Sequence, residues 1–361
     1  NPVTNQFQNE TFKSFSAGAN SNITLFNGLA NWKTLQRTKL NKIANSYRLD
    51  KMKDDIALSV ANSYLQILFN KEQLKVQKNQ NLVTKENIKR TQELIEAGTL
   101  PAGDIYELQA TDATQQQQII STENALLISK IALCQTLLLE EYATFDISDE
   151  IIDLPMSNVT NETQEAILTK AKESVKDVKI AMSNVDIAKK DVSISRSSYL
   201  PTLSGFFGYN TRWAESTPFN FADQLSLFDG TAIGLQLNVP ILNGFATRGR
   251  VQRAKINQER SEFQLKQAEL DLERNVYQAY NDVINAKKSF EAAQKTLEAR
   301  KQSFNFSKER FDVGLMNSFD FSQASFAYEN AQSDVLRTKY DYIFRTKILE
   351  FYFGIPLIKK Q

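Results

Sequence analysis

The sequence of 361 residues contains no histidine and only one cysteine. Without histidine, Ser-His-Asp and Cys-His nucleophile systems and most catalytic zinc sites are excluded. Cys134 has no partner for an internal disulfide, and its leucine neighbours favour a buried core thiol over a reactive one. The 43 lysines and arginines nearly balance the 42 aspartates and glutamates, whereas nucleic-acid binding requires a basic excess. The composition therefore predicts no enzyme of these classes, no cofactor and no nucleic-acid partner.

Helix breakers and long apolar runs are also scarce. The 12 glycines and 7 prolines are few for this length, so we expect long uninterrupted elements. No charge-free apolar run reaches about 18 residues, so the sequence indicates no transmembrane helix. The residues after Asn1 lack the methionine, basic region and apolar stretch of a signal peptide. We therefore expect a processed or truncated start.

The chain contains one unit twice. Residues 22–30 (NITLFNGLA) and 238–246 (NVPILNGFA) align at an offset of 216, since 238 − 22 = 216. Such a constant register over more than about a hundred residues indicates an internal duplication. Further matches at the same offset pair Gln36, Arg37, Lys39, Val60, Tyr64, Gly98, Asp104 and Leu133 with Gln252, Arg253, Lys255, Val276, Tyr280, Gly314, Asp320 and Leu349.

The second copy has a preamble of a helix and a strand, over residues 162–210, that the first copy lacks. Its counterparts in the first copy would lie at about −54 to −6, since 162 − 216 = −54 and 210 − 216 = −6. We therefore expect the natural chain to extend about fifty or more residues before Asn1 and to include a further helix and strand.

The helical part of each copy follows a heptad pattern, which selects left-handed coiled-coil packing. The first helix of each pair runs for roughly 60 residues, or about 90 Å. These helices alone fit either a membrane-associated tunnel or a soluble periplasmic coiled-coil scaffold or adaptor protein. The heptad positions of the first copy are Val60, Ile67, Leu74, Asn81, Ile88 and Ile95, followed on the returning helix by Ile105, Asp112, Ile119, Leu126 and Leu133.

Alternating strands decide between these two readings. Residues 14–25, 202–212 and 229–240 alternate with a period of two, with apolar odd positions and small or polar even positions. This is the length and pattern of a membrane β-strand beside a water-filled lumen. Three or four strands cannot close a barrel, and unpaired edges are not tolerated in lipid. The strands therefore predict a homo-oligomer that shares one barrel.

Aromatic residues crowd the strand ends and the loop between the second and third strands. They indicate either an interfacial girdle or the aromatic core of a soluble hairpin. These residues are Tyr209, Trp213, Phe219, Phe221 and Phe228.

The turns resemble those of one known family. Asn27-Gly28 and Asn243-Gly244 each close a strand and open a long helix, and residues 199–203 (YLPTL) precede another strand. Gly98 and Gly314 lie in the presumed tips of the helical hairpins, at residues 96–105 and 310–320. In these segments, and over nearly its whole length, the chain resembles the TolC-like outer membrane efflux proteins.

The resemblance implies an α+β membrane protein. Long antiparallel coiled-coil helices would form a periplasmic α-barrel, and strands shared among three protomers would form a twelve-stranded outer-membrane β-barrel. It implies a homotrimer in the outer membrane of a Gram-negative cell, in contact with outer-membrane lipid. The trimer would be a passive exit duct of a tripartite efflux or secretion system, without enzymatic activity. Its partners would be a periplasmic adaptor protein and an inner-membrane transporter. Neither the cargo nor the transporter class follows from the sequence.

The domain organisation expected from the repeat has four parts. Residues 1–141 form the first repeat, truncated at its start, and residues 142–161 form an equatorial linker. Residues 162–353 form the second repeat, and residues 354–361 form a C-terminal tail. The expected elements are a strand at 14–25 and a helical hairpin at 30–141, then a helix at 162–197, strands at 202–212 and 229–240, and a hairpin at 246–352.

The resemblance also implies a periplasmic gate at the hairpin tips. The gate candidates are Asp104, Glu107, Phe311, Asp320 and Gln323, and packing between neighbouring hairpins is the favoured alternative for Phe311. Copies of Asp320 around an axis would form an acidic ring that selects cations, although the uncharged Gln323 occupies a position that is acidic in the family. Two alternatives stay open, because residues 317–320 (NSFD) also have the spacing of a capping box. The aspartates serve as helix caps alone, or as caps that also face the lumen.

Overall fold

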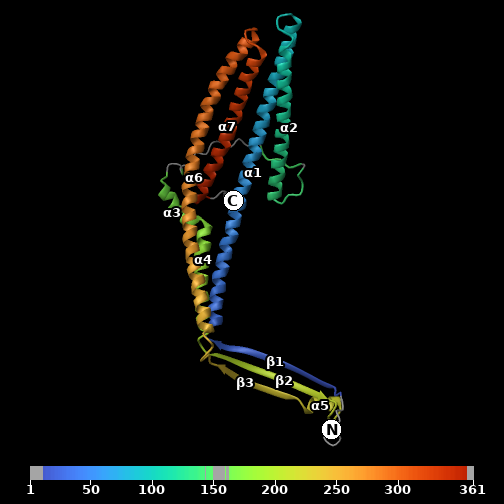
Figure 1. Cartoon of the computed structure of the whole chain (residues 1–361), viewed down its shortest axis with the longest axis vertical. Coiled ribbons are helices and arrows are strands. Elements are labelled where there is room, and N and C mark those ends of the chain that lie inside the picture. Colours follow the sequence, from blue (N-terminus) through green and yellow to red (C-terminus); the bar gives the residue numbers. More distant parts are fainter. Residues whose placement is uncertain (1–10, 143, 149–158, 160–161, 356–361) are drawn as a thin grey trace. The chain divides into compact units, whose positions relative to one another are not determined.

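The computed structural model describes residues 11–142, 144–148, 159 and 162–355. Two compact units divide the chain, one of Asn1–Ser46 and Ile180–Lys266 and the other of Tyr47–Lys179 and Gln267–Gln361. These units cut across the two repeats, so the division of the chain by repeat stays a prediction. The elements in order are β1 (Ser14–Asn27), α1 (Ala30–Glu96), α2 (Asp104–Thr136), α3 (Gln164–Ser174), α4 (Lys176–Ser197), β2 (Thr202–Ala214), α5 (Phe221–Leu227), β3 (Gly230–Asn238), α6 (Ala246–Asp312) and α7 (Ser318–Tyr352) (Figure 1).

The three strands form one antiparallel sheet in the order β1-β2-β3, and each strand end lies within two residues of its predicted position. The register pairs Phe15 with Trp213 and Phe207 with Ile233. Because paired residues share a face, the odd-numbered residues of all three strands lie on one apolar face, as far as the β-bulge between Thr24 and Phe26. The even-numbered residues form the opposite face, which is small and polar except for Phe206.

Glycines on the even-numbered face lie directly opposite its larger side chains. Gly18 pairs with Asn210 and Gly234 pairs with Phe206. A Cβ at Gly18 would lie 2.8 Å from the Asn210 Oδ1, and one at Gly234 would lie 2.8 Å from the Phe206 ring. The larger side chains therefore lie across the glycines of the neighbouring strand.

The duplication predicted at an offset of 216 is confirmed in the helices. Both α1 and α6 have 67 residues, and their first residues, Ala30 and Ala246, differ by 216. The last residues of α2 and α7, Thr136 and Tyr352, also differ by 216. Backbone hydrogen bonds keep the same relation, because the bond from Leu139 to Cys134 corresponds to that from Ile355 to Glu350. The two copies therefore share their turns as well as their helices.

Two predicted helices end or break earlier than expected. The helix expected at 162–197 is interrupted at Val175, whose extended backbone separates α3 from α4. Val175 is buried there, and Ser174 donates a hydrogen bond to the Tyr352 carbonyl at 3.4 Å. The hairpin expected to reach residue 141 has its last helical residue at Thr136, because Leu138 adopts a left-handed φ of 56°. Tertiary contacts and a local backbone reversal thus override the helical pattern.

The unit of Tyr47–Lys179 and Gln267–Gln361 has apolar clusters between its long helices. One cluster joins Leu65 and Leu68 of α1 to Tyr340 and Ile343 of α7. A second cluster, which is largely aromatic, lies near the hairpin tips. Among the described residues, no helix is both long enough and apolar enough to cross a membrane.

Candidate gate at the hairpin tips

Each long helix ends in the same tip turn. Gly98 and Gly314 both have a φ of 75°. The Gly98 N–H donates to the Ile95 carbonyl at 2.9 Å and the Thr99 N–H donates to the Leu94 carbonyl at 3.0 Å, with equivalent bonds at Gly314. This is the Schellman pattern, which satisfies the last carbonyls of a helix and requires a left-handed residue. Both glycines thus end their helices in the same left-handed turn.

Asn317 caps α7 and pairs with Asp320 three residues later, as the spacing predicts. The Asp320 N–H donates to the Asn317 Oδ1 at 2.8 Å, and the Asn317 side-chain amide donates back to the Asp320 carboxylate at 3.0 Å. The Asp320 and Gln323 side chains are both exposed, one helical turn apart. At offset −216 lie Asp104 and Glu107, both partly buried in the first turn of α2. The N-cap residue of α2 is Gly103, which has no side chain, so α2 lacks the side-chain cap that α7 has. The lumen role of these four side chains stays a prediction.

Phe311 lies in the core of the second hairpin. Its side chain is 3% exposed. Its ring stacks on the Phe321 ring with centroids 4.5 Å apart, and Phe321 packs in turn on Phe304 at 5.8 Å. The cluster also contains Leu108 of α2, with Met316 at its edge. Within one chain Phe311 is therefore a packing residue, and its predicted gate role has no support from its position.

A polar seam separates the two hairpins, and the sequence reasoning did not identify it. It is the set of buried polar side chains of α1 together with the polar side chains of α2 and α7 that bond to them or to one another. The Gln73 side chain donates to the Ser333 Oγ at 2.7 Å, and Gln80 donates to Ser325. Among the described residues, the Gln77 Oε1 has no hydrogen-bond partner. The α1 positions with buried polar side chains are Asn70, Gln77, Gln80, Asn81, Thr84, Asn87 and Thr91.

The seam contains a buried carboxylate. Glu329 is 5% exposed and accepts a hydrogen bond from Gln115 at 3.3 Å. Burial raises the pKa of Glu329, and the Gln115 bond opposes this only in part. Asn81 of α1 donates to Asp112 of α2 at 2.7 Å, beside Gln115. Both Asn81 and Asp112 are polar residues in otherwise apolar heptad series, which is the signal that could have found this network.

An ion pair joins the two hairpins near their tips. The Arg90 guanidinium of α1 lies 3.0 Å from the Asp312 carboxylate at the end of α6 and also donates to the Asp312 carbonyl at 3.0 Å. The carboxylate oxygen lacks an aligned hydrogen bond although it contacts the guanidinium. The polar seam and this ion pair thus join the two hairpins alongside the two apolar clusters between them.

The two strand-to-helix turns have the predicted residues in an unusual backbone. Gly28 and Leu29 are both left-handed, with φ values of 64° and 63°, and Gly244 and Phe245 repeat this at 58° and 61°. The Asn27 side-chain amide donates to the Asn31 Oδ1 at 2.8 Å, and the Asn27 Oδ1 accepts the Asn31 N–H at 3.2 Å. Asn243 donates to the Thr247 hydroxyl at 2.6 Å. Asn27, Gly28, Asn243 and Gly244 thus form the same turn twice.

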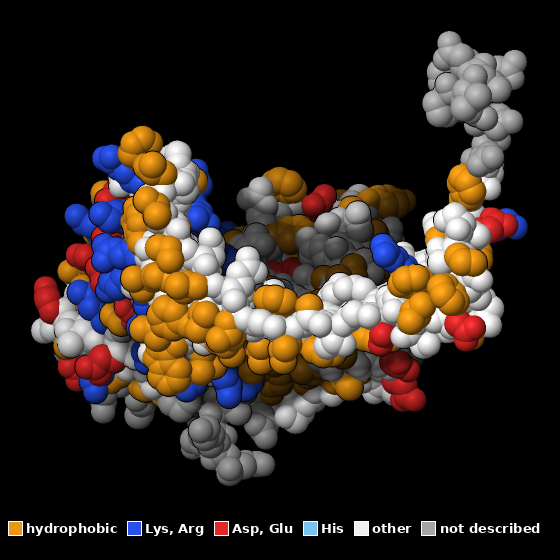
Figure 2. All heavy atoms as spheres, turned by 90° about the horizontal axis from the view of Figure 1, so that it is seen from below, with side chains coloured by type: hydrophobic (Ala, Val, Ile, Leu, Met, Phe, Trp, Pro, Cys, Tyr) orange, Lys and Arg blue, Asp and Glu red, His pale blue; other side chains and the backbone are white. Residues whose placement is uncertain are grey.

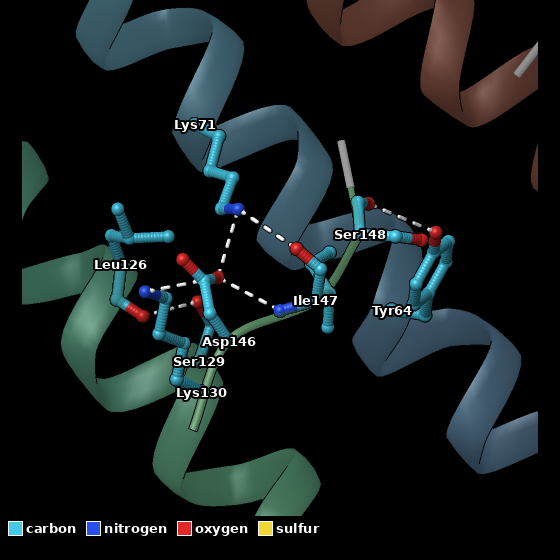
Figure 3. A network of polar contacts seen from close by, with 8 residues as sticks. All are labelled: Tyr64, Lys71, Leu126, Ser129, Lys130, Asp146, Ile147 and Ser148. Atoms are coloured by element: carbon cyan, nitrogen blue, oxygen red, sulfur yellow. Dashed lines mark hydrogen bonds and ion pairs between the residues drawn. The ribbon is translucent and has the colours of Figure 1, made fainter. Parts of the chain in front are cut away.

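Asp146 fastens the segment at 144–148 to the first hairpin (Figure 3). Its carboxylate lies 2.8 Å from the Lys71 ammonium of α1 and 3.1 Å from the Lys130 ammonium of α2. It also accepts the Ile147 N–H at 2.8 Å. The hydrogen bond from Lys71 is the main cause that lowers the pKa of Asp146 from 3.8 to about 2.

We expect the Asp146→Asn variant to loosen this segment. The folded pKa of Asp146 lies below its unfolded value, so its contribution to stability is complete above pH 3.8 and is lost as the pH falls to about 2. The loss at neutral pH stays under about 1 kcal/mol because the side chain is half exposed. The measurement is the rate of proteolytic cleavage within residues 144–148. Asp334→Asn, which removes an ion pair within α7, is the control and leaves that rate unchanged.

Among the described residues, no group of three or more cysteine, aspartate or glutamate side chains is placed to hold a metal ion. Of the carboxylates near the tips, Asp320 belongs to the cap of α7 and Asp312 to the ion pair with Arg90.

The comparisons with known proteins agree on one group of relatives. A family model described as "Outer membrane efflux protein" matches residues 1–137 and 167–353. The chain is 23% identical to outer membrane protein TolC of Vibrio cholerae over 331 residues, which cover 91% of this chain and 74% of that protein. It is 25% identical to the proteases secretion protein PrtF of Dickeya chrysanthemi over 245 residues, which cover 67% of this chain and 50% of that protein.

A solved structure shares the fold. The Campylobacter jejuni CmeC outer membrane channel matches with a TM-score of 0.73 at 16% identity, over 95% of this chain and 77% of that chain. The long helices, the small antiparallel sheet and the turns that connect them are therefore a known arrangement.

Proposed function

Since this chain belongs to the outer membrane efflux protein family, we propose that three copies of it assemble into one duct, which a periplasmic adaptor protein and an inner-membrane transporter supply. As a member of this family, the chain forms part of a passive exit duct in the outer membrane, and its helical part lies in the periplasm. It performs no bond chemistry. The cargo and the class of transporter are left open.

The two faces and the two edges of the sheet both favour a barrel that several chains share. The odd-numbered face has large apolar side chains, among them Ile233 and Leu235, which are 82% and 70% exposed in the single chain. The opposite face is small and polar, as a water-filled lumen requires. In the three-stranded sheet, β1 and β3 are the edge strands, and open edges are not tolerated in lipid. Copies of the chain that pair edge to edge remove both problems, whereas a soluble scaffold has no use for such a face.

The tips are the proposed gate. Asp320 and Gln323 on α7, and Asp104 and Glu107 on α2, would line the narrow end of the tunnel. The Arg90–Asp312 ion pair and the polar seam would hold the two hairpins of one chain together in the closed state. Phe311 would stabilise the second hairpin from its core.

Single-channel recording in planar bilayers tests this proposal. Purified full-length chain should insert in uniform conductance steps, and chemical cross-linking should stop at the trimer. Asp320→Ala should reduce the block by added divalent cations, because it removes the acidic ring. Gln323→Ala is the matched control, one turn along α7 and uncharged. Unchanged cation block in Asp320→Ala would leave Asp320 as a cap only, and failure to insert would refute the duct.

A further inference from the structure

The loop between β2 and β3 is an ordered cap built around one buried side chain. Gln224 of α5 is 1% exposed. Its amide donates to the carbonyls of Ala214, Thr217 and Phe219 at 3.1, 3.3 and 2.6 Å, and its Oε1 accepts the Ala214 N–H at 2.9 Å. A side chain that satisfies four backbone groups fixes the path of the loop. The apolar residues of the loop are therefore held in place.

This cap lies on the apolar face of the sheet. The Phe221 ring of α5 packs on Phe15 at 5.6 Å and on Trp213 at 5.7 Å between ring centroids. Phe15 and Trp213 are register partners on the odd-numbered face. The Thr211 hydroxyl, on the same face, donates to the Leu225 carbonyl at 2.6 Å. Figure 2 shows hydrophobic side chains gathered along the sheet and at its end beside α5. The Phe221 side of the cap therefore covers the apolar face, while Phe228 at the end of α5 lies against Arg212 of the polar face.

The length of the strands places α5 at one boundary of the apolar band. The apolar side chains of β1 run from Phe15 to Leu25. Ten residues at about 3.3 Å each span about 33 Å along the strand. A tilt of about 40° reduces this to a height of about 25 Å, the thickness of the apolar band of an outer-membrane barrel. The strand-to-helix turns lie at the other end of the strands, so α5 lies at the boundary away from the helices (Figure 1).

We propose that α5 and the residues around it form an interfacial anchor, which inserts into the headgroup region of the outer leaflet on the lipid side of the wall. The proposal rests on the proposed function, because it needs the sheet to span the outer membrane. Phe219, Phe221 and Leu227 are 49%, 48% and 57% exposed on this rigid cap. Aromatic side chains favour this depth of a membrane. The anchor continues the lipid-facing surface of the strands, which identifies lipid as its occupant.

Depth-resolved quenching of tryptophan fluorescence tests the anchor. The chain has two tryptophans, Trp32 and Trp213. Replacing both by phenylalanine gives a background in which Phe221→Trp places one probe on α5. The full-length chain is reconstituted into phosphatidylcholine vesicles with bromine either near the headgroup or near the bilayer centre. We expect the Phe221→Trp probe to lose most of its emission to the shallow bromines and little to the deep ones.

Two further probes in the same background separate this inference from the proposed function. Ile233→Trp lies in the middle of the apolar face and should be quenched most by the deep bromines, whereas Gln236→Trp on the polar face should be quenched by neither. If Ile233→Trp responds and Phe221→Trp does not, the anchor is refuted. Aqueous iodide then shows whether the loop faces water or is covered by a neighbouring copy. If Ile233→Trp is also insensitive to lipid, the spanning sheet itself is refuted.

Discussion

The Gly28→Ala variant should unfold at a much lower temperature than the Gly244→Ala variant, although both glycines occupy the same turn of the repeat. Both are left-handed, with φ values of 64° and 58°, which costs an alanine about 1–2 kcal/mol. At Gly28 a Cβ would also lie 2.6 Å from the Ser197 carbonyl oxygen and 2.8 Å from the Leu200 Cβ. Overpacking of this kind adds about 1–3 kcal/mol. The total loss for Gly28→Ala is therefore about 2–5 kcal/mol.

Gly244→Ala is the matched control because nothing lies within 4 Å of its added Cβ. It carries the backbone cost without the clash. The measurement is the midpoint of thermal unfolding of each purified variant in detergent, followed by far-ultraviolet circular dichroism. Equal midpoints for the two variants would contradict the packing of the first turn against the end of α4.

The Phe311→Ala variant should lose about 3–5 kcal/mol of stability, as expected for a buried phenylalanine. The lost ring contacts Phe321 at 4.5 Å and belongs to the cluster that includes Leu108 of the other hairpin. Its removal leaves a cavity next to the tip turn at Gly314. We expect α6 and α7 to fray near the tip, measured as faster amide hydrogen exchange there than in the wild type.

Phe319→Ala provides the comparison for this prediction. Phe319 lies in the first turn of α7 and is 55% exposed, so its truncation should change stability by less than about 0.5 kcal/mol. If Phe311 instead lined the constriction, Phe311→Ala would raise the conductance without loss of stability. A stable Phe311→Ala variant with raised conductance would thus overturn the packing role.

The duplication made much of the fold predictable. Once residues 22–30 and 238–246 were aligned, the start of α1 at Ala30 also gave the start of α6 at Ala246. The strands followed from alternation alone, because a half-buried sheet requires a period of two. Gly98 and Gly314 followed from the need of a helix end for a left-handed residue.

Features that depend on tertiary contacts were beyond the sequence. The helix α5 is only seven residues long and depends on Gln224, whose four backbone partners lie outside the helix or at its margin. No local sequence pattern predicts a buried glutamine of this kind. The interruption at Val175 has the same origin, since its burial and the contact of Ser174 with Tyr352 involve distant parts of the chain.

The candidate site was predicted less completely than the fold. The cap of α7 by Asn317 and Asp320 could be predicted from their spacing of three residues, because a capping box involves only neighbouring residues. For Phe311 the sequence left open both packing between hairpins and a place at the constriction, because a heptad position facing a partner helix and one facing a lumen look alike in sequence. The contact between Asn81 and Asp112 required knowledge of which residues of the two helices face each other.

The pairing of glycines with larger residues on the polar face bears on how selective the duct can be. The side chains of Asn210 and Phe206 lie flat over glycines of the neighbouring strands. They therefore do not project from the polar face of the sheet. The polar face is thus levelled at these two pairs, although a hollow lined by Ser16, Asn210 and Arg212 lies beside the cap. If this face lines the proposed duct, Asn210 and Phe206 do not project into it to bind a passing molecule, which favours selection of the cargo by the transporter that loads the duct.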